Sequence, residues 1–517
     1  MFKKKPAIVL VFLLVLISFA YNFHEILFFR PYSIHQWRQV DGLSITLNYF
    51  QENLNFFQPS INWIGANGSG KAVGEFPFIY YTVAQLWKLF GQHEFIFKLF
   101  NIIIVFIGLI QLFRLFKTQT SDTFWSMYSV LFLFTSPVLV YYTNNFLPDA
   151  PSFGLAIIGC FYLEKYYSKS SNNALYISSL FFLIAGLLKI TSLIVFVAII
   201  PLQIFLILKN QKNRKIDTLI PFVAVFIPII AWIKYADFYN NSNNRGVFLQ
   251  DIKPIWELNF WQIKPIAIEF YNLILPNFFN ITALILLLFL LIFSLFNYKN
   301  ANKFLLLLTT ISILGSFLFL LLFFQNLNVH DYYLVNLLII IPLILLTFIN
   351  LVKRIYPVFF KMKAIKTIAV IGLLMLIYNT AVINRMKYNT KDYLVRKTIF
   401  VDKTTLDFWK WYHWNYENTY KALENIKPFL RNVGIKRTDK VISIPDQSLN
   451  ISLYLMDQKG FTDFGYAEQG AERIIKFKEM GAKYLIINDP SLLNQEYLKP
   501  FLKNQIGVYQ NISIYRL

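Results

Sequence analysis

This sequence is poor in cysteine and in charged residues. The single cysteine among 517 residues, Cys160, excludes an internal disulfide. Charged residues make up only 15% of the chain, whereas 56% of the residues are hydrophobic and the mean hydropathy is +0.48. These values exclude a soluble globular chain, and the composition therefore predicts an integral membrane protein.

Long apolar runs are what the sequence has in abundance. A helix needs roughly 20 apolar residues to cross about 30 Å of hydrocarbon. About eleven runs reach or approach that length. We expect spanning helices near residues 6–23, 95–116, 124–143, 147–167, 174–189, 190–209, 217–236, 272–297, 303–325, 332–352 and 366–384. The runs that meet near Asn145 and Lys189 are contiguous, which leaves their borders open.

Basic residues in the short loops predict the orientation, because Lys and Arg favour the cytoplasmic side. The N-terminus begins with Lys3, Lys4 and Lys5, so every second loop is expected to be basic. The five loops concerned agree: they carry Arg114 with Lys117, Lys165 with Lys169, the stretch 209–215, Lys299 with Lys303, and Lys353 to Lys366. The net charge of +21 then needs no nucleic acid to explain it, since these loops face anionic headgroups.

This topology places three long segments outside: residues 24–94, residues 237–271 and the tail from residue 385. A cleaved signal peptide is the alternative for the first run, but no small-x-small cleavage site follows it. We therefore predict a multi-pass protein with a transmembrane domain over 1–384 and an extracytoplasmic domain over 385–517.

The tail has the pattern of a small soluble α/β domain. The segments 441–445, 483–489 and 512–517 are short apolar runs that predict strands, and 471–482 predicts an amphipathic helix closed by Gly481. Roughly 130 residues are enough to bury a core. The whole chain is therefore expected to be a polytopic α-helical membrane protein of about eleven transmembrane helices with a C-terminal soluble α/β domain.

Two stretches of the first outer segment need separate interpretation. Residues 76–91 are apolar but too short to cross, and they predict a helix in the interface plane that either roofs the bundle or lines a lipid-accessible groove. Residues 65–72, GANGSGKA, nearly match a phosphate-binding loop. Ala72 replaces the hydroxyl that would bind magnesium, so a flexible turn is the preferred interpretation.

Ionisable residues gather at the outer ends of the predicted helices: Arg38, Asp41, Glu75, Asp149, Lys189 and His330 with Asp331. Such groups at membrane depth are costly and tend to be functional, although each alone also fits a snorkelling side chain or a cap. Asp149 in LPDAP fits a helix N-cap. Arg38 and Asp41 also fit an interfacial pair that only anchors the loop.

Carboxylates beside cations at the outer leaflet suit one reaction in particular. A carboxylate can take the proton of an acceptor hydroxyl, while Arg, Lys or protonated His stabilises charge on a phosphate leaving group. This combination predicts glycosyl transfer from a lipid phosphate sugar. One general base suffices, in contrast to glycosidases, where a second carboxyl acts as acid. No cofactor and no metal-binding residues are predicted, and the sequence leaves a divalent-metal requirement open.

Five short motifs carry a family resemblance: WRQVD (37–41), GEFPFIYY (74–81), NNFLPDAP (144–151), GLLKIT (186–191) and HDYYLVNLLIIIP (330–342). Together they resemble the bacterial protein-mannosyltransferase and aminoarabinose-transferase-like group, glycosyltransferase family 39, of the GT-C fold. The resemblance covers roughly residues 6–352. It implies a GT-C-like bundle, a polyprenyl-phosphate-linked sugar donor, transfer on the periplasmic face of the bacterial inner membrane and inversion at the anomeric carbon.

The resemblance also assigns roles by position. Asp41 matches the first-loop acidic residue regarded as the base, Asp149 the second acidic position, and Lys189 the basic residue near the donor phosphate. His330 and Tyr332 match the polar start of a late helix that faces the same cavity.

The chain departs from the family at one point, since an Asp-Glu pair is often found where Val40 and Gly42 flank Asp41. Glu75 then becomes a second candidate, and the base remains either Asp41 or Glu75. Arg38 is expected to orient Asp41 or to hold the donor phosphate.

Two other classes of function remain. A transporter or polymerase of polyprenol-linked sugars is one, but transporters commonly show an internal repeat and charges near the midplane, and neither is evident here. A structural assembly protein is favoured only if Asp41 is dispensable. For a transferase, the acceptor is expected to be a glycan, a lipid or a protein, and the sugar a hexose or a pentose. Partners also include membrane lipids but no nucleic acid.

Overall fold

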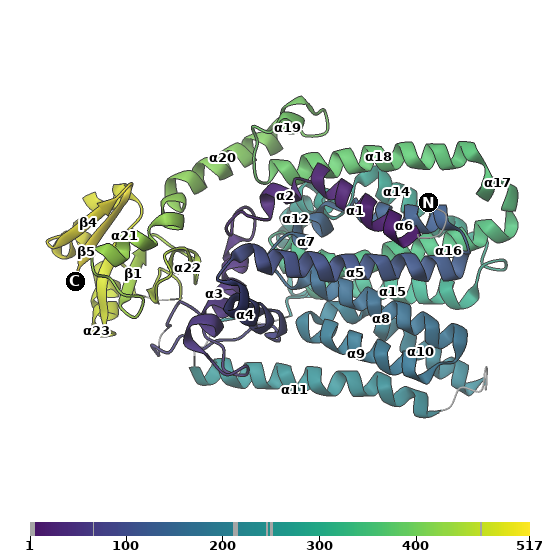
Figure 1. The fold of residues 1–517 in the computed structure, drawn as a ribbon, viewed down its shortest axis with the longest axis horizontal. Coiled ribbons are helices and arrows are strands. Elements are labelled where there is room, and N and C mark those ends of the chain that lie inside the picture. Colours follow the sequence, from purple (N-terminus) through teal and green to yellow (C-terminus); the bar gives the residue numbers. More distant parts are fainter. Residues whose placement is uncertain (1–5, 66, 210–215, 244–246, 249–251, 466–467) are drawn as a thin grey trace.

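A helical bundle and a small sheet domain, lying end to end, make up the computed structural model (Figure 1). The structure describes residues 6–65, 67–209, 216–243, 247–248, 252–465 and 468–517. Lys3 to Lys5, Ala66 and most of the basic stretch 209–215 lie outside the described residues, so the predictions that rest on them have no structural outcome.

Every predicted apolar run coincides with a helix or with a broken helix. Six described helical stretches are long and apolar enough to cross a membrane: α5 (Glu94–Thr120), η2 with α10 (Ile190–Leu208), η4 with α11 (Ile216–Asn243), α15 (Lys303–Leu322), η8 with α16 (Asp331–Ile355) and α18 (Lys363–Met386). The number rises to eight if two bent pairs each count as one span. The chain is thus a multi-pass membrane protein, while the expected number of eleven spans is not confirmed.

Two of the expected spans are broken rather than continuous. In the first, α6 (Thr123–Leu133) meets α7 (Pro137–Thr143) at 77°, and in the second, the helix ending at Phe278 meets α14 (Ile281–Phe296) at 83°. Ser136 caps α7 by accepting from Leu139 N–H, and Pro137 occupies the first helical position. Proline has no N–H to continue the preceding helix, so the chain turns there.

The remaining bundle helices are α1 (Pro6–Ala20), α8 (Asp149–Lys169) and α9 (Asn172–Leu188). Helices α5 and α8 approach closely at a pair of glycines. A Cβ on Gly108 would lie 2.7 Å from the carbonyl oxygen of Gly154. Only small residues allow two helices to come this near, as is common between membrane helices.

The first outer segment forms short helices between the bundle and the sheet domain (Figure 1). They are α2 (Phe23–Ile26), α3 (Gln36–Glu52) and α4 (Phe78–Phe90). Helix α4 confirms that 76–91 is helical, whereas its place relative to a bilayer stays a prediction. In the stretch 65–72, Ser60 pairs with Lys71 in an isolated bridge, and Gly65, Gly68 and Gly70 have positive φ. These features describe a tight turn.

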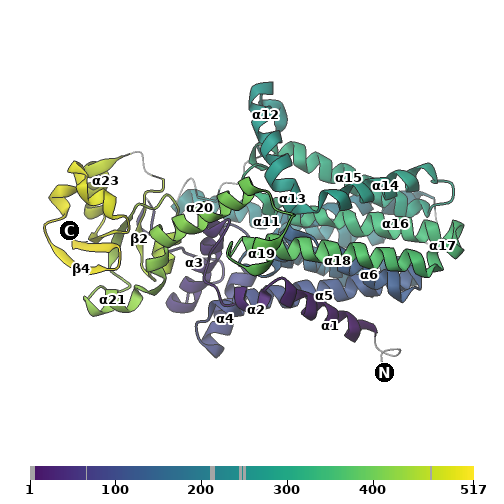
Figure 2. The ribbon, with the colours of Figure 1, turned by 90° about the horizontal axis from the view of Figure 1, so that it is seen from above.

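The segment 237–271 contains η5 (Ile255–Glu257) and α12 (Phe260–Glu269). A π-helical turn, η6 (Phe270–Ile274), and α13 (Leu275–Phe278) follow. Helix α12 projects away from the bundle (Figure 2). The short helices η7 (Phe324–Asn326) and α17 (Pro357–Lys361) complete the membrane part.

The C-terminal part carries a five-stranded mixed sheet of order β2-β1-β3-β5-β4. Its strands are β1 (Lys440–Ile444), β2 (Gly460–Phe461), β3 (Ala482–Ile487), β4 (Gln505–Tyr509) and β5 (Ile512–Arg516). β1 runs parallel to β2 and β3, and β5 runs antiparallel to β3 and β4. The three predicted strands are β1, β3 and β5, and the predicted helix is α23 (Gly470–Glu479), so the soluble α/β domain is confirmed.

In the C-terminal part, four described helices precede the sheet: α19 (Tyr393–Lys397), α20 (Lys403–Thr419), η9 (Lys421–Asn425) and α21 (Lys427–Asn432). Helix α22 (Ile451–Leu455) lies between β1 and β2, and η10 (Pro490–Asn494) and η11 (Glu496–Phe501) lie between β3 and β4. Since α18 runs to Met386, a domain boundary after residue 384 stays a prediction. The sheet lies at the end of the molecule opposite to the described N-terminal residues (Figure 2). Which end faces the cytoplasm also stays a prediction.

Candidate active site

The candidate site lies where α3 meets the N-terminal end of α8 and the C-terminal end of α9. Helix α3 begins after His35, whose φ of 56° turns the chain sharply into the helix. Arg38 and Asp41 then follow three residues apart, which places them on neighbouring positions of one helix face. The Arg38 Nη1 atom lies 3.7 Å from Asp41 Oδ2. Asp41 is buried, with 3% of its surface exposed.

Glu75 is the central carboxylate of the site. Its Oε1 atom forms a close ion pair with Arg38 and lies 2.8 Å from Lys189 Nζ. Its Oε2 atom accepts a hydrogen bond of 3.3 Å from the hydroxyl of Tyr80 on α4. Glu75 therefore joins a residue of the first outer segment to a residue at the end of α9.

Asp149 and Lys189 come from the two helices that follow. Asp149 lies in the first turn of α8 and makes no side-chain cap, so the expected capping role is not what this geometry shows. Lys189 has extended backbone between α9 and η2, with φ of −152°. Its Nζ atom lies 3.5 Å from Asp149 Oδ1, and Asp149 Oδ2 is buried without a hydrogen-bond partner among the described residues.

Tyr332 closes one side of this cluster. Lys189 Nζ lies 5.4 Å from the centre of the Tyr332 ring, within cation–π range. His330 reaches the cluster only through Tyr332, since their ring centres are 5.2 Å apart. A neighbouring group forms around Asp331, whose Oδ1 lies 2.9 Å from His35 Nε2 and accepts from the hydroxyl of Tyr142.

The structure thus brings together Arg38, Asp41, Glu75, Asp149, Lys189 and Tyr332, with His330 beside them. The role of each of these residues in a reaction is a proposal. Among the described parts of the chain, no group of three or more His, Cys, Asp or Glu is arranged to hold a metal ion.

The two carboxylates of the outer segment have different electrostatic surroundings. Burial raises the pKa of Asp41 to about 7, and Arg38 and a hydrogen bond from Asn450 offset only part of that effect. Burial would also raise the pKa of Glu75, but Arg38 and Lys189 outweigh it and hold that pKa well below its usual range. Near neutral pH, Glu75 is therefore ionised, while Asp41 can gain or lose a proton.

Sequence reasoning missed two residues of the site. Tyr80 looked like one aromatic of an apolar helix. Asn450 donates from Nδ2 to Asp41 Oδ1 at 2.8 Å, although it is 409 residues away in the chain. No local pattern marks such a contact, because it exists only when the C-terminal domain packs against α3.

Comparison with known proteins identifies one similar family and several similar structures. Residues 74–234 match the family described as dolichyl-phosphate-mannose-protein mannosyltransferase. The matched range is about a third of the chain and includes Glu75, Asp149 and Lys189. Among curated protein sequences, no match was found.

Solved structures match over nearly the whole chain. ArnT from Cupriavidus metallidurans bound to undecaprenyl phosphate has a TM-score of 0.58 at 11% identity, over 98% of this chain and 97% of that one. The apo state of the same protein has a TM-score of 0.56 at 10% identity, with the same coverage.

The archaeal oligosaccharyltransferase AglB from Archaeoglobus fulgidus, in complex with an inhibitory peptide and a dolichol-phosphate, matches at a TM-score of 0.51 and 13% identity. That match covers 96% of this chain and 71% of AglB. The fold is therefore the GT-C fold, and the resemblance read from the sequence motifs is confirmed.

Proposed function

We propose that this chain, a multi-pass protein of the GT-C fold, transfers a sugar from a polyprenyl-phosphate donor to an acceptor on the extracytoplasmic side of the membrane. The observation that carries the proposal is the buried group of Asp41, Glu75 and Asp149 with Arg38 and Lys189, at the end of the bundle that meets the soluble domain. The similarity to ArnT bound to undecaprenyl phosphate and to AglB in complex with a dolichol-phosphate supports the same class of donor.

Lys189 is the residue we assign to the donor phosphate. It is held among two carboxylates, and its ammonium group also faces the ring of Tyr332. A donor phosphate that binds next to Lys189 and Arg38 would form ion pairs with both cations. Both cations would stabilise the charge that grows on the phosphate as the glycosidic bond breaks.

Asp41 is the residue we assign as general base, in preference to Glu75. Its pKa of about 7 allows it to accept a proton at neutral pH, which is the range where a base is most effective. Glu75 has both oxygens engaged and a lowered pKa, so it is a weak base. Glu75 is better suited to hold Arg38 and Lys189 in place.

The chemistry that follows is a single displacement. The acceptor hydroxyl attacks the anomeric carbon, the bond from that carbon to the phosphate oxygen breaks, and Asp41 takes the hydroxyl proton. The leaving polyprenyl phosphate keeps the electron pair of the broken bond. One displacement inverts the anomeric configuration. Hexosyl and pentosyl donors, and glycan, lipid and protein acceptors, all fit this scheme.

A direct test is donor consumption by the purified protein in detergent. We expect wild-type protein to release free polyprenyl phosphate from at least one of a set of hexosyl and pentosyl polyprenyl phosphates, with water as a slow acceptor. Lys189→Gln should raise the KM for the donor by about ten-fold or more, because it loses a charged contact to phosphate. Movement of intact donor across vesicles without any release would contradict the proposal and favour a transporter.

Lys410→Gln is the matched control for this experiment. Lys410 lies on α20 with 56% of its side chain exposed, and among the described residues its one ion-pair partner is the exposed Asp407. Its removal should leave the KM for the donor unchanged. An equal rise of KM in both variants would show that the effect of Lys189→Gln is not specific to the site.

A further inference from the structure

One face of α3 is polar along its whole length and is turned toward the C-terminal domain. Asp41, Ser44, Asn48 and Glu52 follow one another at separations of three and four residues, which places them on the same side of a helix. Only the first belongs to the candidate site. The other three contact residues 437–459.

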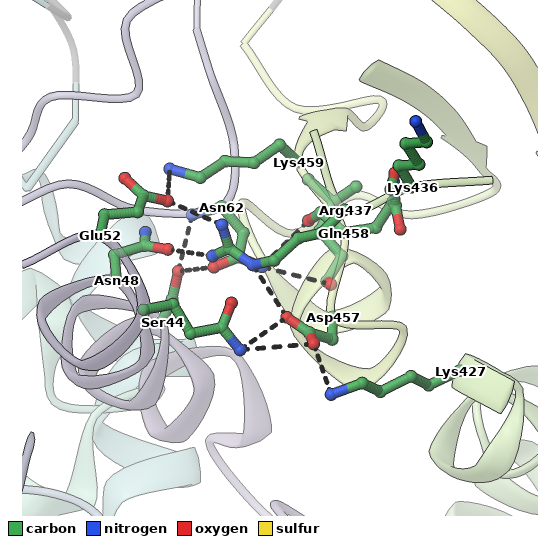
Figure 3. A network of polar contacts seen from close by, with 12 residues as sticks. Ser44, Asn48, Glu52, Asn62, Lys427, Lys436, Arg437, Asp457, Gln458 and Lys459 are labelled. Carbon is green, nitrogen blue, oxygen red and sulfur yellow. Dashed lines mark hydrogen bonds and ion pairs between the residues drawn. The ribbon is translucent and has the colours of Figure 1, made fainter. Parts of the chain in front are cut away.

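A network of charges holds the far end of this face (Figure 3). Arg437 donates to Asn48 Oδ1 at 2.5 Å and to Glu52 Oε1 at 2.8 Å, and its Nε atom lies 3.0 Å from Asp457. Lys459 Nζ lies 2.9 Å from Glu52 Oε1. The C-terminal domain is therefore fastened to α3 two to three turns away from Asp41.

The first outer segment also extends the sheet domain. Trp63 forms a parallel bridge with Gly460, and Ile64 N–H donates to the carbonyl oxygen of Gly460 at 3.0 Å. The side chain of Ile64 packs in the core of the sheet domain. Backbone pairing and burial thus fix the domain relative to α3 more firmly than side-chain contacts alone would.

Asn450 lies at a position where an Asn side chain usually caps a helix. It is the N-cap of α22, and an Asn there normally accepts a hydrogen bond from the first turn of the helix. Its side chain makes no such bond. The first turn is satisfied by others, since Ile451 N–H donates to Ser448 Oγ and Ser452 N–H donates to Asp446 Oδ2. The amide of Asn450 is left free for Asp41.

The orientation of that amide is fixed by its other contacts. Asn450 Oδ1 accepts from the backbone N–H of Trp63 at 3.1 Å and from Ser44 Oγ at 3.3 Å. A backbone N–H can only donate, so the oxygen must face Trp63 and the NH₂ group must face Asp41. Asn450 is fully buried, so solvent water does not compete with Asp41 for the hydrogen bond from its amide.

We propose that Asn450 of the C-terminal domain is a positioning residue for Asp41: its amide donates to Oδ1, orients the carboxylate, and favours its ionised form. The proposal rests on the assignment of Asp41 as base in the proposed function. It makes the soluble domain a structural part of the active site. The contacts of Trp63 with Gly460 and with Asn450 itself hold Asn450 beside the base.

The direction of the effect follows from the groups that face Asp41. Arg38 on the same helix and Asn450 from α22 both lower its pKa, while Glu75 from the outer segment and burial raise it. Loss of the Asn450 donor removes one stabiliser of the anion, so the pKa of Asp41 rises further. The base is active when deprotonated, and the acidic limb of the pH profile should therefore move to higher pH.

The test is the pH dependence of polyprenyl phosphate release by full-length protein carrying Asn450→Leu. We expect the acidic limb to move up from about 7 by about one pH unit, which corresponds to the loss of one hydrogen bond to a charged group. The rate at pH 7 should then fall about five-fold, because the ionised fraction falls from a half to about a tenth. The rate on the alkaline plateau should stay near that of wild type.

Asn450→Asp keeps the size of the side chain and the oxygen that faces Trp63. This variant is the second test of the proposal if the Asn450→Leu protein does not fold. Two adjacent carboxylates share a site unfavourably, and the acidic limb should move up by more than one unit. Arg437→Gln is the control, because it removes a contact between the same domain and α3 two to three turns away from Asp41, while the contacts of Trp63 still hold Asn450 in place. It should leave the midpoint of the acidic limb where wild type has it.

The outcomes separate this inference from the proposed function. If wild type releases no polyprenyl phosphate from any donor, the proposed function fails. If wild type is active but both Asn450 variants keep the wild-type midpoint, or lose rate equally at all pH values, Asn450 has only a structural role. An equal shift in Arg437→Gln would also overturn the inference.

Discussion

Among the residues of the site, Glu75 and Asp41 show how the same chemical group acquires different properties. Both are carboxylates with little exposed surface and with Arg38 nearby. Glu75 has two cations against one oxygen, whereas Asp41 has one cation at 3.7 Å and one neutral amide. Because both carboxylates have little exposed surface, the difference between their pKa values comes from the number and distance of the nearby cations. Glu75 therefore stays an anion that holds the cations in place, and Asp41 can accept a proton.

A stability measurement tests the structural role of Glu75. Glu75→Gln leaves Arg38 and Lys189 without their shared partner in a largely buried place, and breaking such a pair on one side costs about 3 kcal/mol or more. We expect a clearly lower midpoint of thermal unfolding in detergent. Glu496→Gln is the control, because the Glu496 side chain is 84% exposed and, within the described part of the chain, forms an ion pair with Lys499 alone. Equal midpoints for the two variants would contradict the bridging role.

The sequence identified the charged members of the site because each stands beside an apolar helix end, where charge is unexpected. Asp41, Glu75 and Lys189 could be named in this way. Their contacts could not be predicted in this way, since the ion pair of Glu75 with Lys189, for example, joins segments more than a hundred residues apart. Asn450 gave no signal, because an Asn before a short helix is fully explained as a cap.

At the scale of elements, the close crossing of α5 and α8 supports the position of Asp149. Gly154 lies five residues after Asp149 on the same helix, and a Cβ there would meet Ile104 O at 3.0 Å. The two helices are therefore in backbone contact just below the site. Any side chain at this crossing would push α8 outward and carry Asp149 away from Lys189.

A glycine substitution tests this crossing. Gly108→Leu places a large side chain against the backbone of Gly154, and overpacking of this kind costs about 1–3 kcal/mol or more. We predict a reduced thermal midpoint and a loss of folded yield. Gly372→Leu on α18 is the matched control, because nothing lies within 4 Å of a Cβ at that position. A tolerated Gly108→Leu would mean that α5 and α8 are not packed as described.

The sequence predicted whether a segment forms a helix or a strand wherever its apolar residues form a long run or a short segment of strand length. The apolar runs became helices, and the apolar segments 441–445, 483–489 and 512–517 became strands of the sheet. The breaks were harder to predict, because Ser136 and Pro137 lie within a run that is otherwise apolar. Strand β2 has only two residues and owes its pairing to β1, so it carries no pattern of its own.

Over the whole molecule, the soluble domain and the bundle meet around the site rather than beside it. Arg30 of the first outer segment donates to the carbonyl oxygen of Glu424 and pairs with Glu94 at 3.0 Å, and Tyr454 donates to the same Glu94 at 2.8 Å. These contacts, together with the network in Figure 3, join the C-terminal domain to the bundle and to α3, the helix that carries Asp41. The sequence predicted a transmembrane domain over 1–384 and an extracytoplasmic domain over 385–517, but docking between them depends on tertiary contacts.

The most direct measurement is the turnover number for polyprenyl phosphate release by Asp41→Asn. If Asp41 is the base, the substitution should lower kcat by about a hundred-fold or more, with little change in thermal midpoint, because it removes proton acceptance and keeps the shape. Asp407→Asn, on the exposed face of α20, should match wild type. A folded Asp41→Asn protein with a turnover number close to wild type would contradict the assignment of the base.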